Sequence, residues 1–300
     1  MNAIEIQGLT KSFRGLYAVD HLDMTVPVGA IYGFIGENGS GKSTTMKLIC
    51  GHLVADGGKI RLFDRRHTDA GVRSRVGALI ENAGCFPSSS IYQNLKMQAI
   101  NLGLANADDE IYRVLAIVRM EDEARLPFRK CSLGMKQRVG IALALLGDPA
   151  LLILDEPING LDTDGMRIMR EILLDITHTY GCTVLISSHI LGELEKIATH
   201  YGIIRRGHMV QELSAAGMES RARVFCDIKT RDLQGAYELL ARTDAPDVRL
   251  EGGAVRVYGV ADTEALTSFL MSRGLVPYEV RPNKIGLEEY YLELMSRQEA

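Results

Sequence analysis

The chain has 300 residues, enough for one large domain or two unequal ones, and its 46% hydrophobic content is typical of a globular protein with a sizeable core. Its formal net charge of -4 provides neither the basic footprint of a nucleic-acid-binding protein nor an acidic tail. The five cysteines are scattered and never spaced as CxxC, which argues against a disulfide framework or a zinc site and for reduced thiols in a cytosolic protein.

The N-terminal region alternates short apolar runs with polar turns. Residues 4–9 and 20–26 have the composition of strands, and residues 30–35 are apolar enough to form a buried strand. A glycine-rich turn follows at 36–41, and a helix is predicted for 42–51. A strand, a glycine-rich turn and a helix in this order begin a parallel α/β unit.

The middle of the chain indicates a helical insertion and two further buried strands. Residues 90–130 are rich in helix formers, with helices predicted at 92–103 and 108–119. Apolar strands are predicted at 151–154 and 183–187, with helical patterns between them. The alternation predicts a mostly parallel sheet surrounded by helices.

A change of pattern near residue 217 predicts a second, smaller domain. Its predicted elements are a strand at 224–228, a helix at 233–241, strands at 248–250 and 255–258, a helix at 263–272, a strand at 276–281 and a final helix at 287–294. The first six follow the order β-α-β-β-α-β of a ferredoxin-like unit. We therefore expect domains at 1–216 and 217–300, with a helical subdomain at about 88–135 in the first.

The glycine-rich turn has the sequence G-x-x-x-x-G-K-[ST] of a phosphate-binding loop. Its glycines allow backbone N–H groups to surround phosphate oxygens, while Lys42 reaches the β and γ phosphates and Ser43 ligates Mg²⁺. A chance glycine-rich turn is the alternative, but this one lies between a strand and a helix, as the mechanism requires. The expected ATP contacts are Gly36, Glu37, Asn38, Gly39, Ser40, Gly41, Lys42, Ser43 and Thr44.

Two acidic residues end the apolar strand at 151–154. Asp155 is placed to hold Mg²⁺, directly or through water, and Glu156 to polarise the attacking water. The alternative is that the two acids only end the strand at the solvent, but the phosphate loop in the same chain favours a catalytic function for them.

Three further motifs make the chain resemble the ABC ATPases. The segment CSLGMKQR at 131–138 resembles the family's signature, NGLD at 159–162 resembles its D-loop, and His189 ends a strand as the family's H-loop histidine does. Together with the phosphate loop and the acidic strand, these motifs occur in the family's order over residues 1–215. The resemblance implies a P-loop NTPase fold of the ABC type, with a mostly parallel sheet, an antiparallel β part and a helical subdomain, followed here by a small C-terminal α+β domain.

The resemblance also assigns roles to residues outside the phosphate loop. It implies that Phe13 stacks on adenine, that His189 contacts the γ-phosphate, and that Ser132 and Gly134 contact ATP bound to the other subunit. It places Asp162 at the dimer interface. A core aromatic is the plainer interpretation of Phe13.

Two departures from the family pattern concern coupling. Glu81 stands where the family's Q-loop has glutamine; a carboxylate can still ligate Mg²⁺ but cannot donate a hydrogen bond as an amide does. Leu133 and Met135 replace a glycine and a glutamine of the signature. Leu133 is therefore expected to crowd the approach of the backbone to phosphate.

Both departures resemble the ATPase subunits of bacitracin and lantibiotic export and immunity systems. This branch implies an ATP- and Mg²⁺-dependent ATPase that powers export of a peptide antibiotic or another hydrophobic compound. The implied partners are a second ABC subunit, in a homodimer or a pair, and a separate membrane permease, but no nucleic acid.

The N-terminal residues do not have the pattern of a signal peptide, and no stretch is apolar enough to span a bilayer. We therefore expect a cytoplasmic protein held peripherally at the inner face of the cell membrane. A soluble ABC ATPase that acts on nucleic acid or ribosomes, or a regulatory ATPase with a ligand-binding C-terminal domain, is the alternative.

Overall fold

The computed structural model describes residues 1–300 except 222–223, 244–246, 261 and 298–300. The chain divides into two units, Met1–Ala215 and Ala216–Ala300, each with a hydrophobic core. Among the described residues, no helix combines the length and apolar character needed to cross a lipid bilayer.

The first unit is built on a six-stranded sheet in the order β10-β9-β3-β8-β7-β6. All neighbouring strands are parallel except β10, which runs antiparallel to β9, so the predicted mostly parallel sheet is confirmed. Every residue of the central strands β3 and β8 is buried, as expected for strands covered on both faces. The strands are β3 (Ile31–Ile35), β6 (Val76–Leu79), β7 (Leu151–Asp155), β8 (Thr183–Ser188), β9 (His200–Arg205) and β10 (His208–Ser214).

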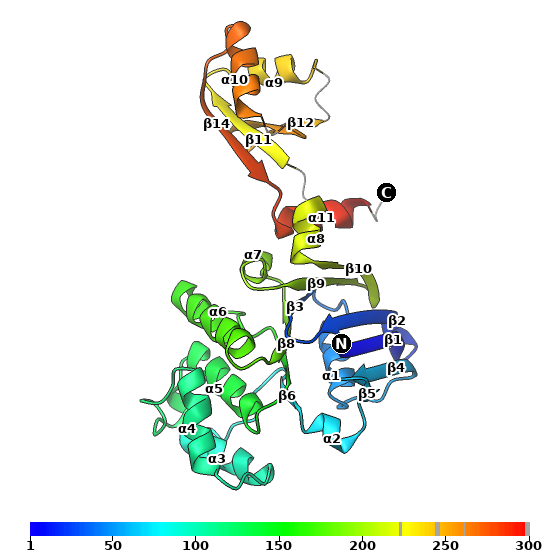
Figure 1. Ribbon diagram of the computed structural model, residues 1–300, viewed down its shortest axis with the longest axis vertical. Coiled ribbons are helices and arrows are strands. Elements are labelled where there is room, and N and C mark those ends of the chain that lie inside the picture. Colours follow the sequence, from blue (N-terminus) through cyan, green and yellow to red (C-terminus); the bar gives the residue numbers. More distant parts are fainter. Residues whose placement is uncertain (222–223, 244–246, 261, 298–300) are drawn as a thin grey trace. The chain divides into compact units, whose positions relative to one another are not determined.

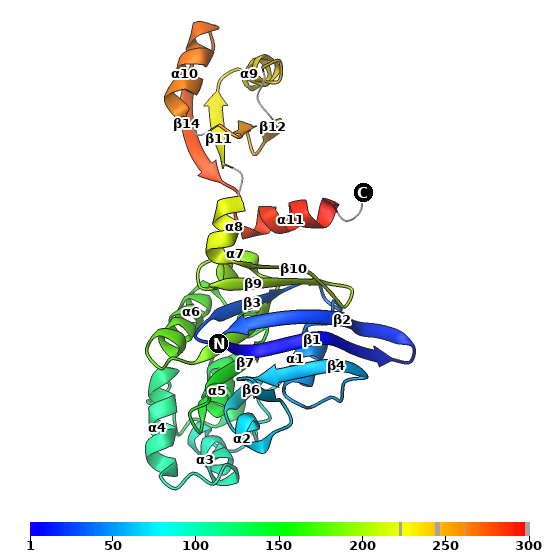
Figure 2. The ribbon, with the colours of Figure 1, turned by 45° about the vertical axis from the view of Figure 1, so that its right-hand side comes forward.

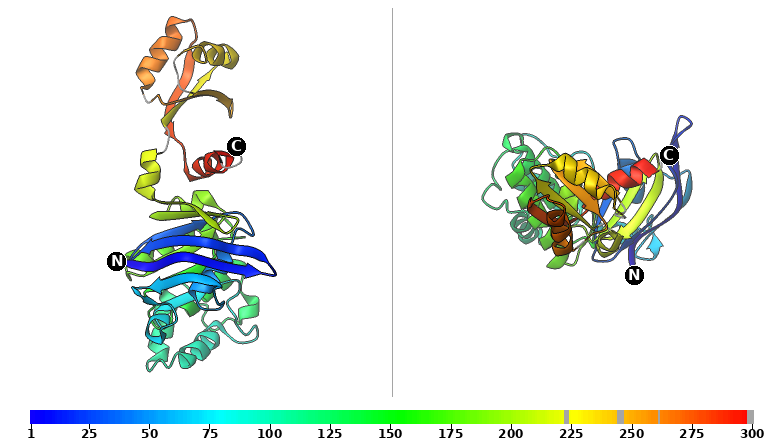
Figure 3. Two further views of the ribbon diagram at one scale, coloured as in Figure 1. Left: turned by 90° about the vertical axis from the view of Figure 1, so that its right-hand side faces the viewer. Right: turned by 90° about the horizontal axis from the view of Figure 1, so that it is seen from above.

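A four-stranded antiparallel layer in the order β2-β1-β4-β5 covers one face of the parallel sheet (Figure 2). Its strands are β1 (Asn2–Phe13), β2 (Leu16–Pro27), β4 (Gly57–Leu62) and β5 (Arg65–Arg66). Figure 3 shows β1 and β2 side by side as a long hairpin. Helix α1 (Lys42–Ile49) lies between the two layers, and its buried Met46 and Leu48 join the core that they share.

Helices α3 to α6 lie on the other side of the parallel sheet, while α2 lies beside the antiparallel layer (Figure 1). Helix α5 packs on β6 and β7, helix α6 packs on β8, and α3 and α4 pack on α5. Both helices predicted between residues 90 and 130 are present, as α3 and α4. The bounds are α2 (Ala70–Arg73), α3 (Ile91–Asn101), α4 (Ala107–Ile117), a 3₁₀ turn η1 (Phe128–Lys130), α5 (Leu133–Leu145), α6 (Thr163–His178) and α7 (Leu191–Leu194).

The second unit contains a four-stranded antiparallel sheet in the order β12-β13-β11-β14. This is the strand order of a ferredoxin-like split β-α-β unit. Cys226 and Ile228 of β11 pack with α9 and α10 in the core on one face of this sheet. The elements are α8 (Ala215–Arg221), β11 (Val224–Thr230), α9 (Leu233–Leu240), β12 (Asp247–Glu251), β13 (Ala254–Tyr258), α10 (Thr263–Ser272), β14 (Pro277–Lys284) and α11 (Leu287–Arg297).

Candidate nucleotide-binding site

The phosphate loop connects the end of β3 to the start of α1 at the carboxyl edge of the parallel sheet. Beside it lies a cavity of about 170 Å³. Its lining brings together residues far apart in the sequence: Ala18 of β2, Asn38, Gly39, Gly41, Lys42, Ser43 and Thr44 of the loop and α1, and Glu156 after β7. Helix α1 begins at Lys42 without a side-chain cap, so its first N–H groups have no side-chain acceptor and can face an anion.

Two glycines of the loop have no room for a side chain. A Cβ atom on Gly36 would lie 2.4 Å from the Ile204 carbonyl oxygen, and one on Gly41 would lie 2.4 Å from the Ala18 carbonyl oxygen. Gly41 also has φ of 111°, in the left-handed region that disfavours other residues. The tight wrapping of the loop therefore depends on glycine at both positions.

Two polar groups at the loop, Lys42 and Ser40, are placed where they could bind an anion. Lys42 is 6% exposed, and its Nζ donates to the carbonyl oxygens of Gly36 at 2.6 Å and Glu37 at 3.0 Å. Burial lowers the pKa of Lys42, while the nearby carboxylates of Glu156 and Asp155 act in the opposite direction. The Ser40 hydroxyl is buried with no hydrogen-bond partner among the described residues, an arrangement that a bound phosphate oxygen would satisfy.

Glu156 lies between Lys42 and His189. One carboxylate oxygen is 4.0 Å from Lys42 Nζ, and the other is 2.8 Å from His189 Nδ1. Glu156 has φ of 51°, a strained backbone conformation for a non-glycine residue. A carboxylate held between a buried lysine and a half-exposed histidine can orient and deprotonate a water beside the γ-phosphate.

Sequence reasoning missed Ser187, a fully buried residue of β8 that contacts both acids. Its hydroxyl donates to Asp155 Oδ1 at 2.6 Å and accepts from the Glu156 N–H at 2.8 Å. Only the pairing of β7 with β8 reveals this contact, because that register sets Ser187 beside Asp155.

The donor set fits Mg²⁺, which prefers hard oxygen ligands. Ser43 lines the cavity, and Asp155 ends β7, which β8 separates from β3, with its Oδ2 outside the hydrogen bond to Ser187. Glu81, the third predicted ligand, is 64% exposed and ion-paired with Lys47 at 2.5 Å. Lys47 lies four residues after Ser43 on α1, so Glu81 is held about one helical turn from the predicted metal site.

Phe13, the predicted adenine-stacking residue, lies at the end of β1 and is 46% exposed. It pairs with Leu16 across the β1–β2 hairpin, whose second strand carries Ala18 to the phosphate-loop cavity. The Lys11 ammonium lies 5.4 Å from its ring centroid. An exposed ring at this hairpin is a surface available for stacking and not part of the core.

The signature residues do not join the phosphate loop of the same chain: neither Ser132 nor Gly134 lines its cavity, among the residues described. Ser132 caps α5, its hydroxyl accepting from the Met135 N–H at 3.2 Å. Leu133 is half exposed and lies against Gly160 of the D-loop segment.

Asp162, the predicted interface residue, caps α6 by accepting a hydrogen bond from Gly165 N–H at 2.9 Å. The signature and the D-loop segment therefore lie at the starts of α5 and α6, where Leu133 approaches Gly160 and Leu161 approaches Gly134.

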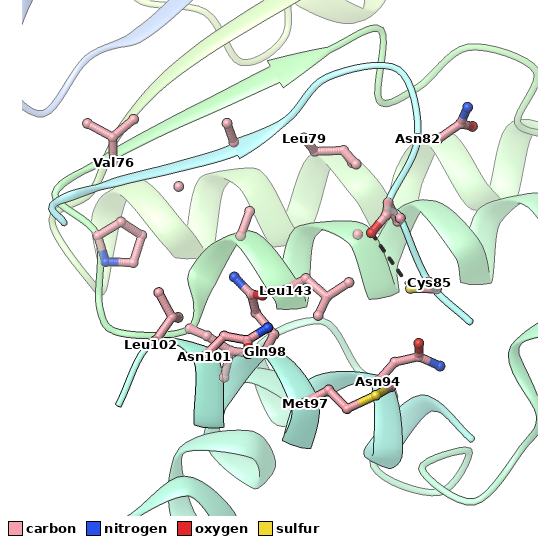
Figure 4. A pocket seen from close by; sticks show the side chains of 18 of the residues that line it. Val76, Leu79, Asn82, Cys85, Asn94, Met97, Gln98, Asn101, Leu102 and Leu143 are labelled. Atoms are coloured by element: carbon pink, nitrogen blue, oxygen red, sulfur yellow. Dashed lines mark hydrogen bonds between the residues drawn. The ribbon is translucent and has the colours of Figure 1, made fainter. Parts of the chain in front are cut away.

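A second cavity, of about 330 Å³, lies between β6, α3 and α5 (Figure 4). Leu79, Met97 and Leu143 form apolar parts of its wall, and Figure 4 shows several side-chain amides around them. The amides belong to Asn82, Asn94, Gln98 and Asn101. Glu81 does not line this cavity but a neighbouring one that shares Leu79 and Asn82 with it.

Sequence comparison relates the chain to transport ATPases. The family described as "ABC transporter" matches residues 19–159. The bacitracin transport ATP-binding protein BcrA of Enterococcus faecalis is 34% identical over 297 residues, covering 97% of this chain and 96% of that protein. The lantibiotic transport ATP-binding protein SrtF of Streptococcus pyogenes is 37% identical over 222 residues, covering 74% of this chain and 95% of that protein.

Solved structures support the same fold. An ATP-binding subunit of an ABC transporter has a TM-score of 0.65 and 26% identity, covering 73% of this chain and 92% of that chain. The ATP-binding cassette MJ0796, in a dimeric post-hydrolysis state bound to ADP and Pi, has a TM-score of 0.65 and 19% identity, covering 71% of this chain and 98% of that chain. The predicted ABC-type ATPase fold is confirmed.

Proposed function

The chain belongs to the ABC transporter family as an ATP-binding, ATP-hydrolysing subunit, and on that premise we propose that it powers export of a peptide antibiotic or another hydrophobic compound through a separate permease. The observation that carries the proposal is the 34% identity to the bacitracin transport protein over 97% of the chain. A soluble ABC ATPase without a transport partner is not favoured, because the relatives that match nearly the whole chain carry transport names.

ATP binds with its phosphates in the loop at residues 36–44 and its adenine on Phe13. Ser43 and Asp155 would hold Mg²⁺, which would neutralise phosphate charge, and Glu81 would add a ligand if its ion pair with Lys47 opened. Glu156 takes a proton from the attacking water, and His189 both orients Glu156 and contacts the γ-phosphate. The orphaned Ser40 hydroxyl, the crowded glycines and the Lys42–Glu156–His189 arrangement support these roles.

The complete site requires a second ABC subunit. Ser132 and Gly134 lie apart from the chain's own phosphate loop, so they are available to contact ATP bound to a partner, with Asp162 at the interface. The dimeric cassette bound to ADP and Pi supports this arrangement. ATP then favours the closed dimer, because its γ-phosphate contacts both subunits, and hydrolysis removes that preference.

The cavity between β6, α3 and α5 is the proposed docking site for the permease, which would hold the subunit at the inner face of the membrane. Its apolar wall with several amides suits an amphipathic segment that buries apolar side chains and caps its backbone groups. Its proximity to Glu81 supports transmission of nucleotide state to the partner. The match to the lantibiotic relative covers 74% of this chain and 95% of that protein, which supports an accessory role for residues 217–300.

Affinity purification from detergent-solubilised host membranes tests the proposal. We expect a polytopic membrane protein to co-purify in stoichiometric amount, and the pair to lower the sensitivity of cells to a peptide antibiotic only while Glu156 is intact. Purification of the subunit alone, or with ribosomes or nucleic acid, would leave the ATPase chemistry and refute the export function.

A further inference from the structure

Three exposed basic residues share one face of β4 and β5 at the edge of the antiparallel layer, and we call them the hairpin basic surface: Lys59, Arg61 and Arg66. Arg65 is also exposed but lies opposite the buried Leu62, on the other face. None of them forms an ion pair within the part of the chain that the structure describes. In Figure 1, their strands β4 and β5 lie beside α2 at the margin of the first unit. A net acidic chain therefore has a local concentration of unneutralised positive charge.

The strand register places like charges opposite each other. Arg61 of β4 pairs with Arg66 of β5, an arrangement that is destabilising unless an anion lies between the side chains. Lys59 lies two residues before Arg61 on the same face. Glu5 of β1 is the cross-strand neighbour of Arg61, but its carboxylate accepts a hydrogen bond from Gln7 and does not pair with Arg61.

The turn that holds these arginines together is strained. Phe63 and Asp64 have φ of 50° and 63°, which form a two-residue turn that glycine or asparagine would normally supply. The Phe63 ring is buried under the Arg75 guanidinium at 4.2 Å, and this contact stabilises the turn. The turn places Arg66 opposite Arg61, and the strain that this turn requires points to a function for the placement.

We propose that the hairpin basic surface binds the phosphate groups of anionic phospholipids, so that the ATPase subunit touches the membrane beside its permease. This rests on the proposed function, which places the subunit at a membrane. The three side chains of this surface are exposed and share one face of the sheet, so they form an open array suited to a plane of charges. The array also adjoins the proposed permease site, because Arg73, two residues before Arg75, lines that cavity.

The test is sedimentation of the purified full chain with vesicles of phosphatidylcholine alone or of equal parts phosphatidylcholine and phosphatidylglycerol. We expect binding only to the anionic vesicles, weakened by salt. The double variant Arg61→Gln/Arg66→Gln should bind about 25-fold more weakly, since each basic residue near an anionic surface contributes about fivefold. The matched control Arg231→Gln/Arg242→Gln removes two exposed arginines from the second unit and should bind as the wild type does.

Several outcomes would overturn the lipid proposal. One is that the wild type does not bind anionic vesicles, and another is that both double variants lose the same amount of vesicle binding. A third is that inorganic phosphate, at concentrations too low to screen charge, abolishes vesicle binding. Unchanged vesicle binding with loss of permease co-purification in Arg61→Gln/Arg66→Gln would identify an acidic segment of the permease as the partner instead. Intact vesicle binding without any co-purifying permease would count against the proposed function alone.

A second inference comes independently from Ser187, whose hydroxyl donates a hydrogen bond to Asp155 and accepts one from the Glu156 N–H. The geometry points to Ser187 as a positioning residue that couples the Mg²⁺ ligand to the general base. Fixing Asp155 Oδ1 leaves Oδ2 for the metal or its water, and the bond to the Glu156 amide stabilises the strained backbone that directs Glu156 at the site.

Ser187→Ala tests this role, with Ser188→Ala as its control. Ser188 is also fully buried, but its hydroxyl accepts from the Ile190 N–H and contacts neither acid. We expect Ser187→Ala to raise the Mg²⁺ concentration for half-maximal turnover about tenfold and to lower kcat about tenfold. Calorimetry with the non-hydrolysing Glu156→Gln background should show the same tenfold weakening of Mg²⁺-dependent, but not Mg²⁺-free, ATP binding. Equal effects of the two variants, or a lower melting temperature with unchanged Mg²⁺ dependence, would reduce Ser187 to a packing residue.

Discussion

Replacing Glu156 by glutamine should separate ATP binding from hydrolysis. The amide is nearly isosteric with the carboxylate, and its oxygen can still accept from His189, whose Nδ1 is 2.8 Å away. Lys42 keeps its carbonyl contacts at 2.6 and 3.0 Å, so the phosphate loop and its affinity for ATP should remain intact. The amide cannot accept the proton of the attacking water.

Loss of a general base costs about 100- to 10,000-fold in rate, or about 3–5 kcal/mol in the activation barrier. We therefore expect kcat for phosphate release to fall by at least 100-fold, while the Kd for ATP from calorimetry changes less than threefold. Glu121→Gln is the matched control, because this carboxylate is exposed on the helical part of the first unit, away from the phosphate loop. A kcat within tenfold of the wild type would refute the assignment of Glu156 as the base.

Three further predictions concern the loop and the thiols. Lys42→Ala should weaken ATP binding at least tenfold in calorimetry, because we propose that the buried ammonium meets the β and γ phosphates; unchanged affinity would exclude the loop as the binding site. Gly36→Ala should destabilise the chain by about 1–3 kcal/mol and lower its melting temperature, since the new Cβ would lie 2.4 Å from the Ile204 carbonyl oxygen; an unchanged melting temperature would contradict the close approach. Burial raises the pKa of both Cys50 and Cys182 to about 12, so neither thiol should react with iodoacetamide at pH 8 until the chain is unfolded; alkylation of the native protein, detected by peptide mass spectrometry, would show that these sites open.

Local patterns in the sequence were sufficient for much of the fold. Continuous apolar runs predicted β3, β7 and β8, because strands covered on both faces need no polar alternation. The six-element order of the second unit was predicted from short strands around glycine turns, and the structure has that order. Strands β9 and β10 were not predicted, since β10 mixes half-buried and exposed positions and has no clear period.

The phosphate loop was recognisable from sequence because its chemistry is contained in nine consecutive residues, each with a local geometric reason. The roles assigned to Glu81, Phe13 and the signature residues stay predictions, and for Glu81 the structure adds a competitor, Lys47, that lies far from it in the sequence. The residues around Glu81 do not predict this contact, because it forms only when α1 packs next to the segment after β6.

What the sequence determined by itself is the kind of chemistry: a loop for phosphates, an acidic strand end and a histidine at the end of another strand. Only the tertiary structure decided which side chains contact one another. Register between parallel strands brought Ser187 to Asp155, and pairing of β4 with β5 set Arg61 opposite Arg66. Such contacts join residues that are distant in the chain or separated by a strained turn, so they depend on the packing of whole elements, which local composition does not encode.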